Sequence, residues 1–466
     1  MSAATIAEDM AGGVTEATAP MEPDAANAPR GGATNAAYVV FLLAAANAVS
    51  FFDRGFISLV IDPIKATLHL TDTQIGLMIG PAFIIFYSTV SLPIARLADS
   101  WNRKRIIIAG MLFWSACTAL FGLGKNFLTL GAARMGVGLG EAALVPAGVS
   151  IIGDIVPRER MSRSVSAFTA GGIFGGSFAP LAGGLLMLWL TGIPDVVLPG
   201  IGALAPWQTA FVIISLPGIL LAFVIMATMR EPVRVHRSRG EKAQSGREAA
   251  AYIWRHKRAV LVPILGFAMI STIGGVTTWT PSFFMRTYGW STADVGVAIG
   301  IISITLGTTG AIAGGWMADE LRRRGREDAN ILIAVGAMLA MLPMGIIMFL
   351  TDNAWLSMGM MAIKSFTLAV AFGVAHPCVS LAAPPTMRSQ AVATYLLSAN
   401  MVGIGIVPVL IPLMNDYVFH DPMALRHSLN IVSIAVTPLS VGLLLWGRKA
   451  FVAHVEAMMK AGSSVR

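Results

Sequence analysis

The chain carries a succession of apolar stretches, each about as long as the hydrocarbon core of a bilayer is thick. A helix rises 1.5 Å per residue, so about 20 apolar residues cross a core of roughly 30 Å. Only 12% of the 466 residues are charged, against roughly 25% in soluble domains, and the mean hydropathy is +0.72. These features predict an all-α polytopic membrane protein and exclude a large soluble core. We expect twelve membrane spans, at about 36–61, 74–94, 106–124, 127–153, 164–190, 207–229, 259–284, 294–318, 330–350, 355–381, 390–414 and 425–447.

The loops between these spans alternate in charge. Lys and Arg gather in 95–105, 157–163 and 319–328, whereas 191–206 and 415–424 contain neither residue. Basic loops stay on the cytoplasmic side, so we expect both termini to be cytoplasmic and the protein to be integral to the plasma (inner) membrane. The net charge of +8 then reports topology, and we expect no nucleic acid partner.

A polar, basic break at 230–258 divides the spans six and six. The two halves also repeat a motif, because Ala95-Arg-Leu-Ala-Asp99-(x)3-Arg103-Lys104 returns as Gly315-Trp-Met-Ala-Asp319-(x)3-Arg323-Arg324. The repeat predicts two pseudo-symmetric six-helix bundles with a site at their interface. We expect a disordered cytoplasmic tail at 1–34, bundles at 35–229 and 259–450 joined by the cytoplasmic linker 230–258, and a cytoplasmic tail at 451–466.

Two of the first spans contain charged residues at depth. Asp53 and Arg54 lie in the first span, and Arg134 and Glu141 lie seven residues apart on one face of the fourth. Each such charge costs roughly 2.5–3.5 kcal/mol on insertion scales unless it faces a bundle interior or a wet cavity. Counting along the two antiparallel helices places all four in one slab of the membrane. We interpret them as a single site; structural ion pairs that lock two helices together are the alternative.

These four residues suit proton coupling. Their charges sum to zero when both acids are ionised, and a carboxyl that moves between an apolar setting and an arginine releases or takes up a proton. We expect Asp53 and Glu141 to carry the coupled proton, Glu141 first because it lies nearer the midpoint; the two can also titrate as one unit. Arg54 and Arg134 would tune both acids or bind an anionic substrate.

A second group of charges lies at the cytoplasmic ends of the spans. We expect Asp99, Arg103 and Asp154 to form a cytoplasmic gate, with Asp319 and Arg323 as its counterpart in the second half; anchoring in the lipid headgroups is the alternative. The second half otherwise holds little charge at depth. Lys364 and His376 are the exceptions; we expect Lys364 to extend toward an interface and His376 to be a packing residue.

The sequence offers no cluster typical of catalysis or of a metal site, and we predict no enzyme, cofactor or metal. Gly136, Gly138 and Gly140 lie within a span, where small residues let helices approach, and not in a dinucleotide-binding loop. Cys117 and Cys378 lie in separate apolar spans and indicate no disulfide framework.

The motifs resemble known families. The 95–104 segment and its repeat resemble the cytoplasmic loop motif of the major facilitator superfamily, and the resemblance covers about 36–450. Within it, Ser50-Phe-Phe-Asp-Arg54 resembles the Asn-Tyr-x-Asp-Arg of the Spinster family, with Ser for Asn and Phe for Tyr. Arg134-Met-Gly-Val-Gly-Leu-Gly-Glu-Ala142 and Ile151-Ile-Gly-Asp154 resemble its fourth helix. Spinster proteins are implicated in moving lysolipids and sphingoid phosphates; organic anion:cation symporters, which share the Asp-Arg pair, are the nearest competitor.

We therefore expect a monomeric secondary active transporter that works by alternating access with proton coupling. The resemblance implies an amphipathic anion such as a lysolipid or sphingoid phosphate as its cargo, with membrane lipid as its surroundings. A proton-coupled symporter of a small organic anion is the alternative. A receptor would bind without flux, and a channel would show flux that does not saturate.

Overall fold

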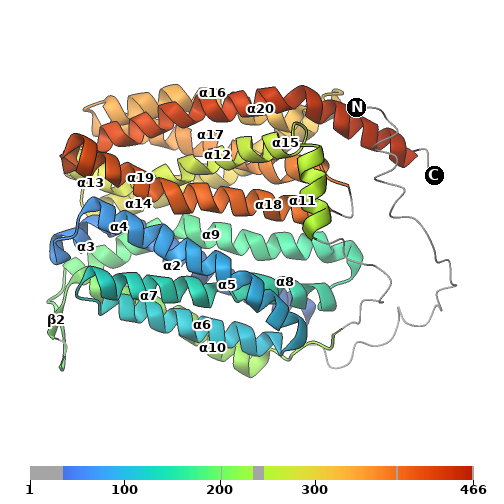
Figure 1. Cartoon of the computed structure of the whole chain (residues 1–466). Helices are drawn as coiled ribbons and strands as arrows, with labels where there is room; N and C mark the ends of the chain where they lie inside the picture. The colour runs from blue at the N-terminus through green and yellow to red at the C-terminus, as the bar shows by residue number, and fades with distance from the viewer. Residues whose placement is uncertain (1–34, 201, 235–245, 385–386, 464–466) are drawn as a thin grey trace.

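The computed structural model describes residues 35–200, 202–234, 246–384 and 387–463. Long helices run side by side along one axis, as Figure 1 shows. Eleven of them, within the described ranges, are long and apolar enough to cross a membrane, and the bent pair Leu261–Thr277 and Thr280–Tyr288 makes a twelfth. The prediction of an all-α polytopic protein is confirmed.

The first group of elements lies in the lower part of Figure 1. It comprises α2 (Ala36–Leu59), α3 (Ile61–Leu68), α4 (Asp72–Ile79), α5 (Pro81–Ser100), α6 (Arg103–Gly122), α7 (Phe127–Glu141), α8 (Leu144–Ile155), α9 (Arg158–Thr191) and α10 (Pro206–Thr228). A short antiparallel hairpin, β1 (Val196–Leu198) and β2 (Gly202–Leu204), projects between α9 and α10. We call α2–α10 the first half.

The second group lies in the upper part of the same view. It comprises α12 (Leu261–Thr277), α13 (Thr280–Tyr288), α14 (Thr292–Ile302), α15 (Thr308–Arg323), α16 (Ala329–Leu350), α17 (Ala354–Leu381), α18 (Arg388–Asn400), α19 (Val407–Leu413) and α20 (Leu425–Ser463). Wider π-helical turns, η2 (Ser303–Gly307), η3 (Met401–Ile406) and η4 (Met414–Phe419), continue α14, α18 and α19, and the short η5 (Pro422–Ala424) precedes α20. We call α12–α20 the second half.

Of the two tails expected from the sequence, the structure describes the C-terminal one, as far as residue 463. The N-terminal tail, 1–34, lies outside the described residues. At the other end α20 continues as helix through most of the expected tail, as far as Ser463. The linker contains one more described helix, α11 (Gly246–Arg255).

Asparagine side chains define where several spans begin. Asn35 accepts a hydrogen bond from Ala37 N, and Asn126 accepts one from Thr129 N. Asn353 does the same for two amides of α17. A side-chain oxygen at this position satisfies amides that have no partner within the helix.

Glycines allow the helices of each half to pack closely. On α9, Gly175 lies so near α2 that a Cβ there would be 2.0 Å from the Ala48 carbonyl oxygen. In the second half, a Cβ on Gly403 would be 2.5 Å from the Ser271 carbonyl oxygen of α12. The same spans of the two halves, the fifth against the first and the eleventh against the seventh, thus meet at glycine.

This packing predicts different effects of two glycine substitutions. Gly175→Ala should lower the unfolding free energy by roughly 1–3 kcal/mol, since the backbone of α2 would have to move. Gly336→Ala on α16 should not destabilise, because open space surrounds that position. Thermal unfolding in one detergent would compare the two, and equal midpoints would contradict the close packing.

Candidate functional site

The charged residues of the first and fourth spans meet inside the first half. Arg54 of α2 donates to Glu141 Oε2 of α7 through Nε at 2.6 Å, with Nη2 at 2.5 Å from the same oxygen. Ser50 Oγ, one turn before Arg54, donates to that oxygen at 2.7 Å. Glu141 Oε1 is buried with no hydrogen-bond partner among the described residues. The described hydrogen bonds and ion pairs of this carboxylate are therefore all made by one of its two oxygens.

Asp53 is buried beside this pair but faces another helix. It accepts a hydrogen bond from Thr118 Oγ1 of α6 at 2.5 Å. Adjacent residues project about 100° apart on a helix, so Asp53 and Arg54 turn toward different neighbours. The two carboxylates thus differ in their donors: Glu141 accepts from a guanidinium, whereas Asp53 accepts from the hydroxyl of Thr118.

Two aromatic rings of α5 complete the site. The ring of Phe83 lies near both guanidinium groups, with its centre 4.6 Å from the guanidinium carbon of Arg54 and 4.8 Å from that of Arg134. Tyr87, one turn along α5, lies 4.7 Å from Arg54. The ring faces carry negative potential and stabilise cations that are out of water. Sequence analysis did not assign these two aromatic residues to the site, and their i, i+4 spacing on one helix face is the signal that could have found them.

Only one charged side chain of the site reaches open space. Asp53, Arg134 and Glu141 are buried, whereas the side chain of Arg54 is 16% exposed. Phe51 lies under Arg54 at 4.8 Å and is itself 38% exposed. A ligand that enters this region therefore meets a cation and an apolar ring together.

The gate residues are only partly brought together. Arg103, buried at the start of α6, contacts Asp154 at the end of α8 and Glu231 after α10, the latter at 3.0 Å. Asp99 is exposed and does not join them; its carbonyl accepts a hydrogen bond from Arg234. In place of the expected cluster of Asp99, Arg103 and Asp154, Arg103 contacts Asp154 and Glu231. Asp99 takes no part because it lies on the exposed face of the end of α5.

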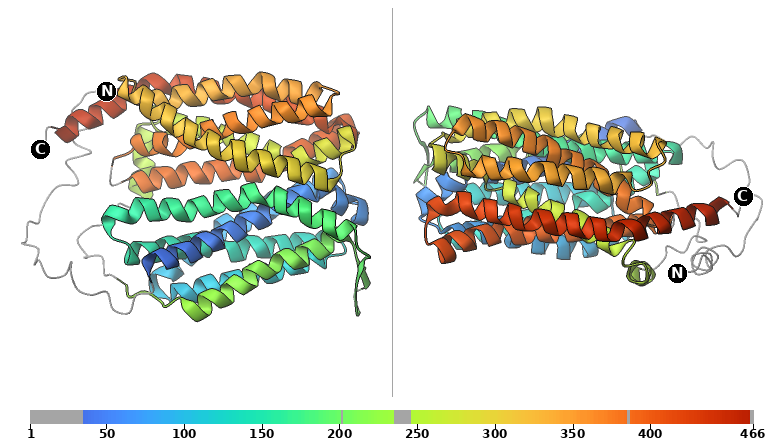
Figure 2. Two further views of the ribbon diagram at one scale, coloured as in Figure 1. Left: turned by 180° about the vertical axis from the view of Figure 1, so that it is seen from behind. Right: turned by 90° about the horizontal axis from the view of Figure 1, so that it is seen from above.

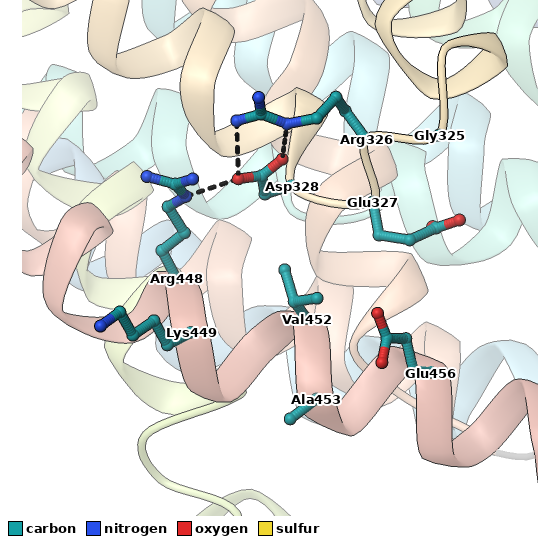
Figure 3. A pocket seen from close by; sticks show the side chains of 9 residues that line it. All are labelled: Gly325, Arg326, Glu327, Asp328, Arg448, Lys449, Val452, Ala453 and Glu456. Atoms are coloured by element: carbon teal, nitrogen blue, oxygen red, sulfur yellow. Dashed lines mark hydrogen bonds and ion pairs between the residues drawn. The ribbon is translucent and has the colours of Figure 1, made fainter.

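The second half has its charge cluster elsewhere than expected. Asp319 is exposed, and Arg323 lies 4.0 Å from Glu320 on the surface. Instead, Asp328 precedes α16 and accepts from Arg326 at 3.0 Å and from Arg448 of α20 at 2.5 Å (Figure 3). These residues line a pocket of about 380 Å³ together with Lys449 and Glu456. Burial opposes ionisation of this acid, but the two arginines hold its pKa below the usual value.

A network that the sequence did not reveal joins the two halves. We call the side on which α5 and α15 end the basic side. At the opposite side, Arg286 of α13 binds Asp72 of α4 at 2.7 Å and Asp62 of α3 at 2.7 Å. Lys65 donates to Asp72 at 2.7 Å, and Asn415 of η4 donates to it at 3.4 Å. Asp72 is completely buried. These residues lie near the ends of the spans, where the sequence does not indicate which loops meet.

One of the two second-half exceptions, Lys364, differs from expectation. Lys364 does not extend to an interface: it is 3% exposed, and its ammonium lies 4.7 Å over the ring of Phe349 with no hydrogen-bond partner among the described residues. Its face of α17 is packed against α16, which leaves the chain no path outward. His376 lies edge-on to Tyr395 at 5.3 Å.

Known proteins match most of the chain. Residues 43–408 match the model of the Major Facilitator Superfamily. An MFS-type efflux pump of Mycolicibacterium smegmatis is 28% identical over 85% of this chain and 89% of that protein. A probable galactarate/D-glucarate transporter of Bacillus subtilis is 26% identical over 71% of this chain and 75% of that protein. Human protein spinster homolog 1 is 23% identical over 82% of this chain and 73% of that protein.

A solved structure has the same arrangement. The crystal structure of a bacterial homolog of the human lysosomal transporter Spinster, in an inward-facing and unoccupied conformation, aligns with a TM-score of 0.75. It is 25% identical, and the alignment covers 91% of this chain and 98% of that one. Spinster proteins are therefore found both among the sequence relatives and among the solved structures that the chain resembles.

The Asp328 cluster predicts a pH-dependent effect on stability. Asp328→Asn should lower the unfolding free energy at neutral pH by roughly 1–3 kcal/mol, because two arginines lose their ionised partner. A carboxyl whose pKa is lowered by folding stabilises the folded state at pH values above its ordinary pKa of about 3.9. This contribution to stability is lost as the pH falls through the pKa of the folded state.

Thermal unfolding of both proteins between neutral pH and about pH 2 would measure the difference. It should persist down to about pH 4 and shrink below that, as Asp328 of the folded wild type takes up its proton. Exposed Glu456→Gln serves as control and should not change the midpoint. A difference that stays constant with pH would contradict the ion pairs.

Proposed function

Because the chain belongs to the major facilitator superfamily and is similar to Spinster transporters, we propose that it moves an amphipathic anion by proton-coupled alternating access. The protein is an integral membrane protein and not an enzyme. The observation that carries the proposal is the pair of Arg54 and Glu141, a partly exposed cation bonded to a buried acid. One event, protonation of the acid, frees the cation.

The coupling follows from the charges of the site. While Glu141 is ionised, Arg54 is held by it at 2.5 Å. A proton on Glu141 removes the attraction, and Arg54 then favours an anionic group of the cargo. Asp53 and Arg134, buried close by, tune the exchange. Proton and anion would thus bind together, which makes the pH gradient a driving force.

The surroundings of Arg54 support an amphipathic cargo. Phe51 is exposed beside it, and on α9 the exposed rings of Phe174 and Phe178 stack at 5.6 Å. Phe178 also lies 6.4 Å from Phe52 of α2. A headgroup on Arg54 would leave an acyl or sphingoid chain against these rings, as in a lysolipid or sphingoid phosphate. The second candidate, a small organic anion, is supported by the similarity to the galactarate/D-glucarate transporter.

The arrangement of contacts supports an inward-facing state. The polar contacts between the halves that involve Arg286 and Asp72 lie at the side opposite the basic one, and Thr73 also donates to Asp416 there at 2.6 Å. We propose that this is the outer side, that the basic side and both termini are cytoplasmic, and that the transporter works as a monomer in the plasma membrane.

In the outward-facing state the roles would reverse. The Arg286 network would break, and Asp99, Asp319 and Arg323, exposed now, would close the cytoplasmic gate near Arg103 and Asp154. Two states are needed for alternating access, and each is held by contacts that the other lacks.

Proteoliposomes with an imposed pH gradient would test proton coupling. Glu141→Gln should abolish accumulation driven by the gradient while it keeps exchange of labelled for unlabelled cargo, since the variant imitates the protonated acid permanently. The expected loss is at least tenfold, about 1.4 kcal/mol of driving force. Glu456→Gln, a change of the same kind far from the site, should behave as wild type. Equal accumulation by the two variants would refute the role of Glu141.

A screen of ligands by thermal shift would decide the class of cargo. Lysolipids and sphingoid phosphates should raise the unfolding midpoint of the wild type, and Arg54→Gln should remove this shift. A shift with sugar acids alone would favour the small organic anion. No shift with either class would contradict the proposed cargo.

The outer network can be tested by distances between spin labels. Asp72→Asn removes the buried charge that binds Arg286 and Lys65, and should move the population toward the outward-facing state. Labels on cysteines at Leu128 and Asp352, both exposed at the outer ends of α7 and α17, should move apart. Exposed Asp195→Asn is the matched control. An unchanged distance distribution in Asp72→Asn would show that the network does not hold the outer side closed.

A further inference from the structure

The linker helix α11 is amphipathic. Ala249, Tyr252 and Ile253 are buried, and so is His256 just after the helix, which gives the i, i+3, i+4, i+7 pattern of one face. The other face is exposed and carries more basic than acidic residues, with one acid, Glu248, in its first turn. Its exposed cations and aromatic residue are Arg247, Trp254, Arg255, Lys257 and Arg258.

The buried face ties α11 to the second half. Tyr252 Oη lies 2.7 Å from His454 Nε2 of α20. The His256 ring lies 4.6 Å from the rings of both Tyr252 and His454. The helix also contacts α18. Its position therefore depends on this docking and not on the linker alone.

The helix lies across the bundle. In Figure 1, α11 runs nearly at right angles to the membrane spans, at the end where α15 and α18 meet the linker. The right-hand view of Figure 2 shows it end-on, at the edge of the bundle and not over its centre. A helix in this position lies in the plane of the membrane at the level of the headgroups, beside the protein.

Its exposed chemistry suits an anionic lipid surface. Trp254 is 67% exposed, and the Lys257 ammonium lies 5.5 Å over its ring. Tryptophan is favoured at the boundary between headgroups and acyl chains, where its ring is partly buried and its N–H stays hydrated. Arg247 and Arg258 are exposed at the two ends of the same segment. An in-plane helix with this composition binds anionic headgroups.

We propose that the exposed face of α11 is a binding surface for anionic phospholipids of the cytoplasmic leaflet. The partner is the lipid surface itself, recognised by Arg247, Lys257 and Arg258 through its phosphates and by Trp254 through the upper acyl region. Lipid binding stabilises the docked position of α11 against α18 and α20. This surface is separate from the site around Arg54 and does not depend on the cargo.

Hydrogen–deuterium exchange of the full chain in nanodiscs tests the proposal. The discs contain phosphatidylcholine, with or without phosphatidylglycerol. Each basic residue near an anionic surface strengthens binding by about fivefold, so phosphatidylglycerol should slow exchange in 246–258 by tenfold or more. High salt should remove the difference, because it screens the attraction.

A triple variant and a matched control make the test specific. Arg247→Gln/Lys257→Gln/Arg258→Gln leaves the residues that dock α11 unchanged and should lose the effect of phosphatidylglycerol, while exchange in phosphatidylcholine stays as in wild type. Arg323→Gln/Arg324→Gln, which removes exposed cations from another loop of the basic side, should keep it.

Three results would overturn the proposal. Wild-type exchange in 246–258 could be the same in both lipids, or the triple variant could retain the effect. Protection by a soluble acidic peptide in discs without phosphatidylglycerol, and not by the anionic lipid, would assign the face to an acidic protein.

Discussion

Taking a charge out of water in the middle of a membrane requires a partner, and this requirement organises the first half. Arg54 and Glu141 satisfy each other, Thr118 satisfies Asp53, and Phe83 lies against both guanidinium groups. To make these contacts, α2, α5, α6 and α7 must keep their relative positions. Gly138 of α7 allows this, because a Cβ there would be 2.6 Å from the Phe83 carbonyl oxygen. The scaffold and the site are therefore one structure.

The sequence indicated more about this buried charged site than about the gates at the ends of the spans. Long apolar runs give the spans directly, and a charge within such a run has to face inward, so the region of Asp53, Arg54, Arg134 and Glu141 could be predicted. Which neighbours they meet could not. Thr118 and Phe83 lie on other spans, and their rotation about the helix axis depends on packing that periodicity alone does not fix. The roles of the four residues in coupling remain predictions.

Charges at the ends of spans are harder to place. Asp72 and Arg286 are 214 residues apart and look like ordinary loop residues in the sequence. The repeated motif was also a limited guide, because its charged residues make different contacts in the two halves. Arg103 begins the third span and is bound by acids, whereas Asp328 precedes the ninth and is bound by arginines. The prediction for Asp319 and Arg323 thus located the right end of the bundle, but in this conformation the ion pairs there form around Asp328.

One feature of the backbone makes the halves mechanically unequal. Within the described residues the wide turns η2, η3 and η4 all belong to the second half. A π-helical turn holds an extra residue, interrupts the regular hydrogen-bond ladder, and is often found at sites of functional bending. The first half, held by the ion pair of Arg54 and Glu141, should move as a rigid body. The second half can bend at the π-helical turns near Thr305 and Gly403, so its spans can change curvature while the first half only tilts.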